Sequence, residues 1–199
     1  LGRIMGGPPL QRSSTLFPAP NATVKMIKTR WLTIVGLVWA AGLFTACGYH
    51  DKPVAEQSAK PNTLTKQEKA EGWELLFDGE SLDKWRGYRK DELPDGWAVE
   101  DGCLTRVGPG GDIVTREQFD DFELCIDWKV TPGGNSGIFF NATEDHDHVF
   151  ESAPEMQVLD NTTHNDGKNT LTSAGANYAL IAPAEDFTNP VGEFNHAVI

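Results

Sequence analysis

The chain has few basic residues for its length, and no acidic residue lies near its amino terminus. It contains 17 Lys and Arg residues against 29 Asp and Glu residues, a formal net charge of −12 at neutral pH. Five of the basic residues precede Cys47 and every acidic residue follows it, so the remainder has 12 basic and 29 acidic residues and a net charge of −17. Because proteins bind nucleic acids mainly through Lys and Arg at phosphates, this composition excludes a nucleic-acid partner.

The sequence also lacks an internal repeat, and after Gln67 it lacks any helical hydrophobic spacing longer than a turn or two. Short apolar stretches occur instead, separated by clusters of Gly, Asn, Asp and Pro. Between Phe122 and Val130 apolar and polar residues alternate, as in a strand with one buried face, and Asp101-Gly102 separates two short strands as a hairpin turn would. These patterns predict an all-β, antiparallel β-sandwich.

Cysteine is scarce, with only Cys47, Cys103 and Cys125 in the chain. In an oxidising compartment Cys103 and Cys125 could form a disulfide, but the sequence does not show whether their Cα atoms come close enough. A bridge and two packed free thiols both remain open.

No apolar run is long enough for an ordinary bilayer span. The longest, residues 31–46, follows Lys25, Lys28 and Arg30 and ends in small residues before Cys47, which is the pattern of a secretory signal. The Cys at this position resembles that of a bacterial lipoprotein signal, so Cys47 is the expected lipidation site. Ordinary secretion and an uncleaved anchor are the alternatives. We expect a lipid-anchored protein of the cell envelope, in the periplasm or on the outer surface, with the membrane as a partner.

Four segments follow from these patterns. Residues 1–25 have neither signal nor domain character and are expected to be disordered or a mis-assigned upstream segment. Residues 26–46 form the predicted signal peptide, and the polar residues 47–70 form a tether. Residues 71–199 form the predicted β-sandwich, whose last residues read as a strand that stops in mid-pattern, so the domain is expected to be incomplete at its carboxyl end.

Two polar residues of one predicted strand stand out as a candidate sugar site. In the segment from Glu155 to Leu159, Met156 and Val158 fall on one face and Glu155 and Gln157 on the other. A carboxylate and an amide on the open face of a sheet could hold sugar hydroxyls.

Motifs spread along residues 72–199 together resemble the 3-keto-disaccharide hydrolase domain family. They are Leu76-Phe77-Asp78-Gly79 with Trp85, Trp97 with Asp101-Gly102, Phe122-Glu123-Leu124, Gly134-Asn135-Ser136-Gly137-Ile138-Phe139, Pro154-Glu155-Met156-Gln157-Val158-Leu159-Asp160-Asn161, Ala174-Gly175 with Tyr178, and Gly192-Glu193-Phe194-Asn195. The resemblance implies a concanavalin A-like jelly roll with a carbohydrate cleft, an exported protein and a substrate oxidised at carbon 3. Members usually continue with further strands, which supports the expectation of an incomplete domain.

In such a substrate the ketone acidifies the hydrogen on carbon 2. A base can then remove this hydrogen, the aglycone leaves from carbon 1, and water adds to complete hydrolysis. Glu155 is the candidate base, although it could equally hold sugar hydroxyls or anchor a loop. Gln157 shares its face and is expected to bind the substrate. His148 is a lower-ranked candidate acid or electrophile.

The remaining candidates have weaker support. Asn135 and Ser136 could reach the cleft or only shape their loop, and Asp160 could bind substrate, although a turn-forming role is favoured. The Asp145-His146-Asp147-His148 loop offers metal ligands without a fixed geometry, so a solvated acidic loop is favoured. No cofactor is expected and no metal is supported.

Two alternatives to this enzyme remain, a non-catalytic carbohydrate-binding module and a structural surface domain. Jelly-roll glucanases typically place their acids as Glu-x-Asp-x-x-Glu on one strand, and the segment from Glu155 to Asp160 lacks this arrangement. Direct chemistry by two carboxylates is therefore disfavoured.

Overall fold

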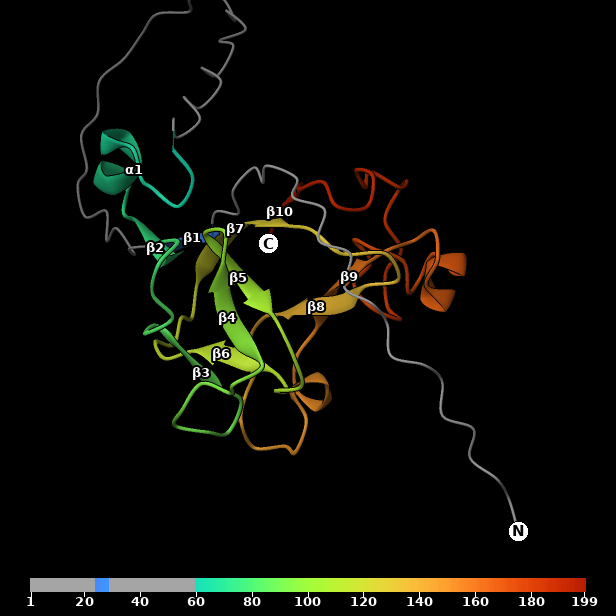
Figure 1. Ribbon diagram of the computed structural model, residues 1–199, viewed down its shortest axis with the longest axis horizontal. Coiled ribbons are helices and arrows are strands. Elements are labelled where there is room, and N and C mark those ends of the chain that lie inside the picture. The colour runs from blue at the N-terminus through green and yellow to red at the C-terminus, as the bar shows by residue number, and fades with distance from the viewer. Residues whose placement is uncertain (1–23, 29–59) are drawn as a thin grey trace, which may run out of the picture.

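The computed structural model describes residues 24–28 and 60–199, and all elements below lie in those ranges (Figure 1). Every pairing between its strands is antiparallel, which confirms the predicted all-β class. The strands are β1 (Val24–Lys28), β2 (Trp73–Phe77), β3 (Trp85–Gly87), β4 (Trp97–Glu100), β5 (Cys103–Arg106), β6 (Ile113–Thr115), β7 (Phe122–Trp128), β8 (Asn135–Phe139), β9 (Glu155–Leu159) and β10 (Asn195–Val198). The helical segments are α1 (Lys66–Glu71) and the 3-10 helices η1 (Val149–Glu151) and η2 (Asn165–Lys168).

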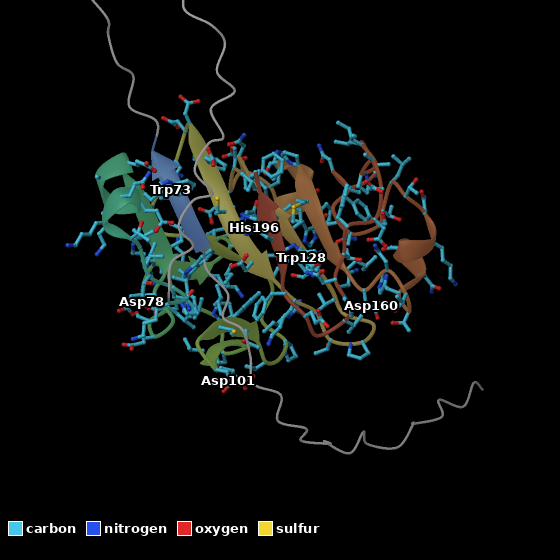
Figure 2. The ribbon with its side chains drawn as sticks, turned by 90° about the horizontal axis from the view of Figure 1, so that it is seen from above. Trp73, Asp78, Asp101, Trp128, Asp160 and His196 are labelled. Atoms are coloured by element: carbon cyan, nitrogen blue, oxygen red, sulfur yellow. The ribbon has the colours of Figure 1, made fainter. Side chains whose placement is uncertain are left out.

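The largest sheet has four strands in the order β10-β7-β1-β2. Figure 2 shows β1 between β2 and β7. The alternation predicted for β7 is confirmed, because Leu124 joins Leu76 and Phe77 in the central hydrophobic cluster and Phe122 and Ile126 pack against it. This cluster anchors the sheet, since burying each such side chain stabilises the fold by about 1.5–3 kcal/mol.

Three two-stranded pairs complete the molecule, namely β3 with β6, β4 with β5, and β8 with β9. The predicted Asp101-Gly102 turn joins β4 to β5, and both residues have positive φ (51° and 72°), as this tight hairpin turn requires. In Figure 1 the β8–β9 pair lies away from α1 and β2, and the chain that follows β9 winds beside it. The candidate site is therefore built from one end of the molecule.

The last ten or so residues of the segment predicted as a tether are folded. Thr65 and Glu68 form a reciprocal capping box at the start of α1, and Gly72 ends the helix with φ +89°. Before the helix, Asn62 is buried and donates to the Gly102 carbonyl at 2.8 Å. This bond attaches the segment to the β4–β5 turn.

Most of the predicted signal peptide and the expected lipidation site Cys47 lie outside the described residues. Strand β1 covers the last two residues of the predicted upstream segment and the first three of the predicted signal. Within residues 24–28 and 60–199, no helix has the length and apolar content of a membrane span. Cys103 and Cys125 form no disulfide with each other, so of the two open possibilities the structure has the unbridged one.

Candidate functional site

Glu155 is partly exposed at the start of β9, on a face of the β8–β9 pair where the next two residues of that face, Gln157 and Leu159, are each only 1% exposed. The register places Gly137 opposite Gln157 and Phe139 opposite Glu155, and directly opposite residues of antiparallel strands point to the same face. Glu155, Gln157 and Asn135 therefore share one face, as the alternation of β9 predicts for the first two. Ser136 is opposite Val158 and belongs to the other face, so the structure does not bring it together with Glu155.

The Glu155 carboxylate lies directly over Gly137. A Cβ at position 137 would come within 1.9 Å of Glu155 Oε1 and 2.6 Å of its Cδ. Only a glycine at this position leaves room for the carboxylate, because any side chain would displace it. The half-buried carboxylate has no hydrogen-bond donor among the residues that the structure describes.

Burial, and secondarily the charge of Asp112, raises the pKa of Glu155 above that of an ordinary glutamate. A carboxylate that is partly desolvated and without a hydrogen-bonded partner is a stronger base than one in water. This combination fits a group that accepts a proton from a bound substrate.

A segment without regular secondary structure borders the other side of β9. Its residues follow β9 through hydrogen bonds from Gln157 N to the Ala176 carbonyl and from Tyr178 N to the Glu155 carbonyl, both of 2.9 Å. Met156 forms an antiparallel bridge with Asn177. Tyr178 is consequently the residue opposite Glu155.

The Tyr178 phenol is close to two carboxylates. Burial first, then the charges of Asp166 and Glu155 and a hydrogen bond to Asp166, raise the pKa of Tyr178. Asp166 belongs to η2, whose N-cap is His164. The phenol therefore keeps its proton at neutral pH and can act as a hydrogen-bond donor.

His164 connects η2 to the beginning of β8. Its Nδ1 accepts the Asp166 backbone N–H at 3.2 Å, and its Nε2 lies 3.5 Å from the Asn135 side-chain amide. With Nδ1 as acceptor, the neutral ring carries its proton on Nε2, so this nitrogen can donate to Asn135 only if that amide presents its oxygen. Asn135 itself is exposed at the edge of this face.

Two predicted substrate ligands have other roles in the structure. Gln157 is only 1% exposed, and its amide donates to the Thr172 carbonyl and accepts from Val158 N. The loop after β9 covers this side chain, so the structure places Gln157 beneath the loop and its role as a substrate ligand stays a prediction. The sequence pattern showed the face of Gln157 but not this covering loop.

Asp160 is 2% exposed and accepts hydrogen bonds from Gly133 N at 2.7 Å and Thr162 N at 2.8 Å, as well as from two Thr hydroxyls. These bonds, led by that of Gly133, hold the pKa of Asp160 far below its usual value. Its oxygens are used within the protein, so substrate binding by Asp160 is corrected to the turn-forming role that the sequence favoured.

His148 is exposed on the loop before η1, and its ring stacks on Phe150 with centroids 5.0 Å apart. The same loop is attached to β3 by a bidentate pair of Arg86 and Glu144 at 2.7 Å, and the Arg86 hydrogen bond lowers the pKa of Glu144 to about 2. No described contact brings His148 to Glu155. Within the described ranges no group of three His, Cys, Asp or Glu side chains is arranged to hold a metal ion.

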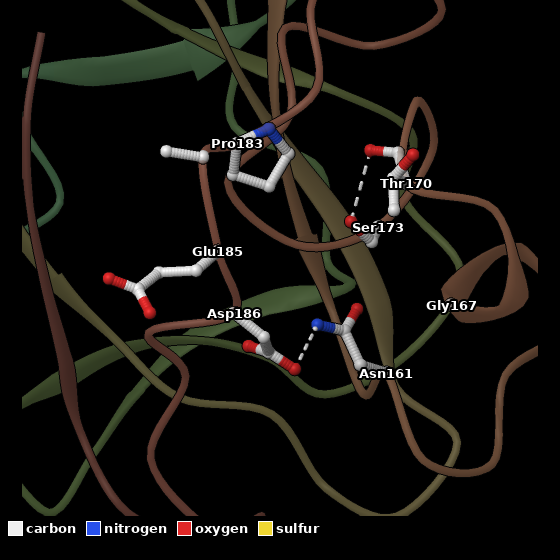
Figure 3. A pocket seen from close by; sticks show the side chains of 8 residues that line it. Asn161, Gly167, Thr170, Ser173, Pro183, Glu185 and Asp186 are labelled. Carbon is white, nitrogen blue, oxygen red and sulfur yellow. Dashed lines mark hydrogen bonds between the residues drawn. The ribbon is translucent and has the colours of Figure 1, made fainter.

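A small hollow lies beside the loop after β9 (Figure 3). It has a volume of about 160 Å³, and in its wall the Asn161 amide donates to Asp186 at 3.1 Å. Ligand pockets usually measure roughly 300–1,000 Å³, so this hollow is too small for a disaccharide. The partly exposed surface around Glu155 remains the better candidate.

Sequence patterns missed Tyr178, Asp166 and His164 as site residues. They lie in segments without strand or helix periodicity. A hydrogen bond from Tyr178 N joins its segment to β9, His164 Nε2 lies 3.5 Å from the Asn135 amide of β8, and Asp166 N donates to His164. In the sequence, Tyr178 stands out only through the family motif that it shares with Ala174 and Gly175. That motif is the one sequence signal that could have identified it as a site residue.

Comparison with known proteins gives consistent results. A family model described as a 3-keto-alpha-glucoside-1,2-lyase-like domain matches residues 72–199. A relative from Bacteroides thetaiotaomicron named 3-keto-disaccharide hydrolase is 38% identical over 165 residues, which cover 72% of this chain and 57% of the relative. The chain thus spans little more than half the length of that relative.

A crystal structure from Parabacteroides distasonis, named provisionally as a glycosyl hydrolase, is similar in fold. It is 35% identical to this chain, with a TM-score of 0.64 over 70% of this chain and 68% of its own. The predicted jelly-roll class and the sequence likeness are both confirmed by these matches. The chain belongs to the 3-keto-alpha-glucoside-1,2-lyase-like domain family.

Proposed function

We propose that this protein is a glycoside hydrolase that cleaves 3-keto-glycosides, including 3-keto-disaccharides, with Glu155 as the catalytic base. The observation that supports this most directly is the half-buried carboxylate of Glu155, which lies over Gly137 without a hydrogen-bond donor in the described part of the chain. The name of the Bacteroides thetaiotaomicron relative supports the same substrate class.

The reaction begins when Glu155 accepts the proton from carbon 2 of the sugar. The electrons of that C–H bond form an enolate whose charge rests on the carbon 3 oxygen. When the ketone forms again, a C1=C2 double bond appears, the C1–O bond breaks, and the aglycone oxygen takes up a proton. Water then adds its hydroxyl to carbon 1 and a proton to carbon 2, so the sum of the two steps is hydrolysis.

Strand β9 supplies one reactive carboxylate, as elimination requires, and not the pair of carboxyl groups that direct substitution at carbon 1 needs. Direct hydrolysis needs two carboxyl groups on opposite sides of one bond, whereas elimination needs one base beside carbon 2. Asp160 directly follows β9 and is the second acidic residue of this segment. Its carboxylate oxygens accept hydrogen bonds from Gly133 N and from two Thr hydroxyls. Glu155 is the carboxylate of this strand that is free to react.

The test is product release from a 3-keto-disaccharide and from the same unoxidised disaccharide. We expect the wild type to cleave only the keto-sugar, and Glu155→Gln to lose this activity by a factor of at least ~10² because the amide cannot accept the proton. Glu123→Gln changes an exposed glutamate on β7 and should cleave at the wild-type rate.

Two outcomes would contradict the proposal. Equal cleavage of both sugars would exclude a mechanism that depends on the ketone. Binding of the keto-sugar without cleavage by the wild type would replace the enzyme with a carbohydrate-binding module on the same fold.

For location, the proposal includes export and lipid attachment at Cys47, which places the protein in the cell envelope. The basic residues before the apolar stretch 31–46, and the confinement of all acidic residues to the part after Cys47, support it. Cys47→Ser should abolish incorporation of a labelled fatty acid in a bacterial host. Equal labelling of both forms would contradict Cys47 as the attachment site.

A further inference from the structure

The proposed elimination places negative charge on the carbon 3 oxygen in a strongly acidic surrounding. Glu155, Asp166 and Asp112 all lie near the site, as the effects of their charges on Glu155 and Tyr178 show. An enolate beside several carboxylates is unfavourable unless a hydrogen-bond donor meets its oxygen. Carbons 2 and 3 are bonded neighbours, so this donor must lie within a few ångströms of the base.

Tyr178 meets that distance requirement. It is opposite Glu155 across the edge of β9, joined to it by the 2.9 Å bond from Tyr178 N to the Glu155 carbonyl. Opposite residues in such pairs have Cβ atoms about 4.5–5.5 Å apart and share a face. The backbone on both sides is held by the Met156–Asn177 bridge and the Gln157–Ala176 hydrogen bond, so the two side chains are on one rigid frame.

The other donors on this face are too far from the base. His164 faces Asn135, which is opposite Leu159, four residues along β9 from Glu155. At a rise of 3.2–3.4 Å per residue this is roughly 13 Å from Glu155. A sugar ring in contact with Glu155 through carbon 2 cannot present its carbon 3 oxygen to His164.

We propose that Tyr178 is a catalytic residue that donates its phenol O–H to the carbon 3 oxygen of the sugar as the enolate forms, and that Asp166 is a positioning residue that acts on this phenol through its charge. The proposal rests on the function proposed above and adds the group that stabilises its intermediate.

The proton and electron balance is simple. The phenol keeps its proton throughout, and its O–H donates to the substrate oxygen while Glu155 takes the carbon 2 proton. When the C1–O bond breaks and the ketone returns, the phenol still carries that proton. The raised pKa of Tyr178, caused first by burial and then by Asp166 and Glu155, agrees with a donor that stays protonated.

The test is Tyr178→Phe in the full chain, with two measurements on a 3-keto-glucoside. NMR in D₂O follows exchange of the carbon 2 hydrogen, and product release follows cleavage. We expect both rates to fall by ~10²–10³ with little change in KM, as for loss of one donor to a developing oxyanion. Tyr88→Phe is the matched control, because its buried phenol donates to the carbonyls of Thr143 and His146; we expect it to alter thermal stability but not the exchange rate.

The outcomes separate this inference from the function on which it rests. If Tyr178→Phe exchanges and cleaves like the wild type, the role of Tyr178 is excluded while the hydrolase stands. If the wild type itself neither exchanges nor cleaves, the proposed function fails and this role fails with it.

If Tyr178→Phe does not fold, the Asp166→Asn variant tests the proposal instead. We expect it to change kcat with little effect on KM and to move the absorbance titration of the Tyr178 phenol toward ordinary tyrosine. An unchanged kcat and an unchanged titration would overturn the proposal.

Discussion

At the scale of single residues, the position of the Glu155 carboxylate depends on the missing side chain of its neighbour Gly137. Gly137 has no side chain, and the Glu155 carboxylate occupies the space where one would be. Glu155 itself could be predicted from the alternation of its strand. The need for Gly137 could not, because it arises between two strands whose register the sequence does not show.

Gly137→Ala tests this arrangement. Its Cβ would lie 1.9 Å from Glu155 Oε1, so the flexible glutamate side chain should turn away rather than the strand unfold. We expect cleavage of the keto-sugar to fall by ~10², the cost of a misplaced catalytic group, with a small change in melting temperature. Gly108→Ala, whose nearest neighbour would be 3.8 Å away, is the control. Retention of full activity by Gly137→Ala would show that Glu155 does not react from this position.

The raised pKa of Glu155, due first to burial and then to Asp112, predicts a pH dependence. The base must be ionised, so kcat/KM should fall with decreasing pH at a value above that of an ordinary glutamate. For stability the sign is opposite: a folded pKa above the unfolded one stabilises the protein at low pH, and this contribution is lost as the pH rises through the folded pKa.

Glu155→Gln should therefore raise the melting temperature at neutral pH more than at pH 4. The pH profile of kcat/KM and thermal melts of the two proteins check both effects. An acid limb at the pKa of a free glutamate would contradict the desolvated carboxylate.

At the scale of elements, the sequence predicted secondary structure correctly where a strand has one apolar and one polar face or where a turn has a characteristic residue pair. β7 was predicted from five alternating apolar residues, and the β4–β5 hairpin from its Asp-Gly turn. Helix α1 was missed because it has only six residues and no buried side chain, although the capping box of Thr65 and Glu68 is visible in the sequence.

The site was predicted only as far as its regular strands extend. The covering of Gln157 and the approach of Tyr178 both depend on the irregular chain that follows β9. Its position is set by individual hydrogen bonds, such as that from Gly175 N to the Gln157 carbonyl at 2.8 Å. Such bonds join residues far apart in the sequence and leave no periodic pattern, so no local window could have shown them.

At the scale of the whole molecule, the proposed processing at Cys47 would remove strand β1 from the chain. β1 consists of Val24–Lys28 and pairs with β2 on one side and β7 on the other. Removal of everything before Cys47 would remove this strand, and the largest sheet would lose the member that joins its two parts. A processed chain stays folded in this sheet only if another strand takes that place.

A chain that begins at Cys47 should therefore be much less stable than the full chain. Nine residue pairs join β1 to its neighbours, and each ladder hydrogen bond contributes a net ~0.5–1.5 kcal/mol, so the loss is several kcal/mol out of a total of roughly 5–15. Thermal melts of the two chains measure this difference, and a chain lacking residues 1–20, which keeps β1, should melt like the full one. Intact mass of the protein from a bacterial envelope fraction then shows which form exists there. If the Cys47 form predominates and melts at the same temperature as the full chain, β1 contributes nothing to the mature fold. The backbone N–H and C=O groups of β2 and β7 that pair with β1 must then have other hydrogen-bond partners.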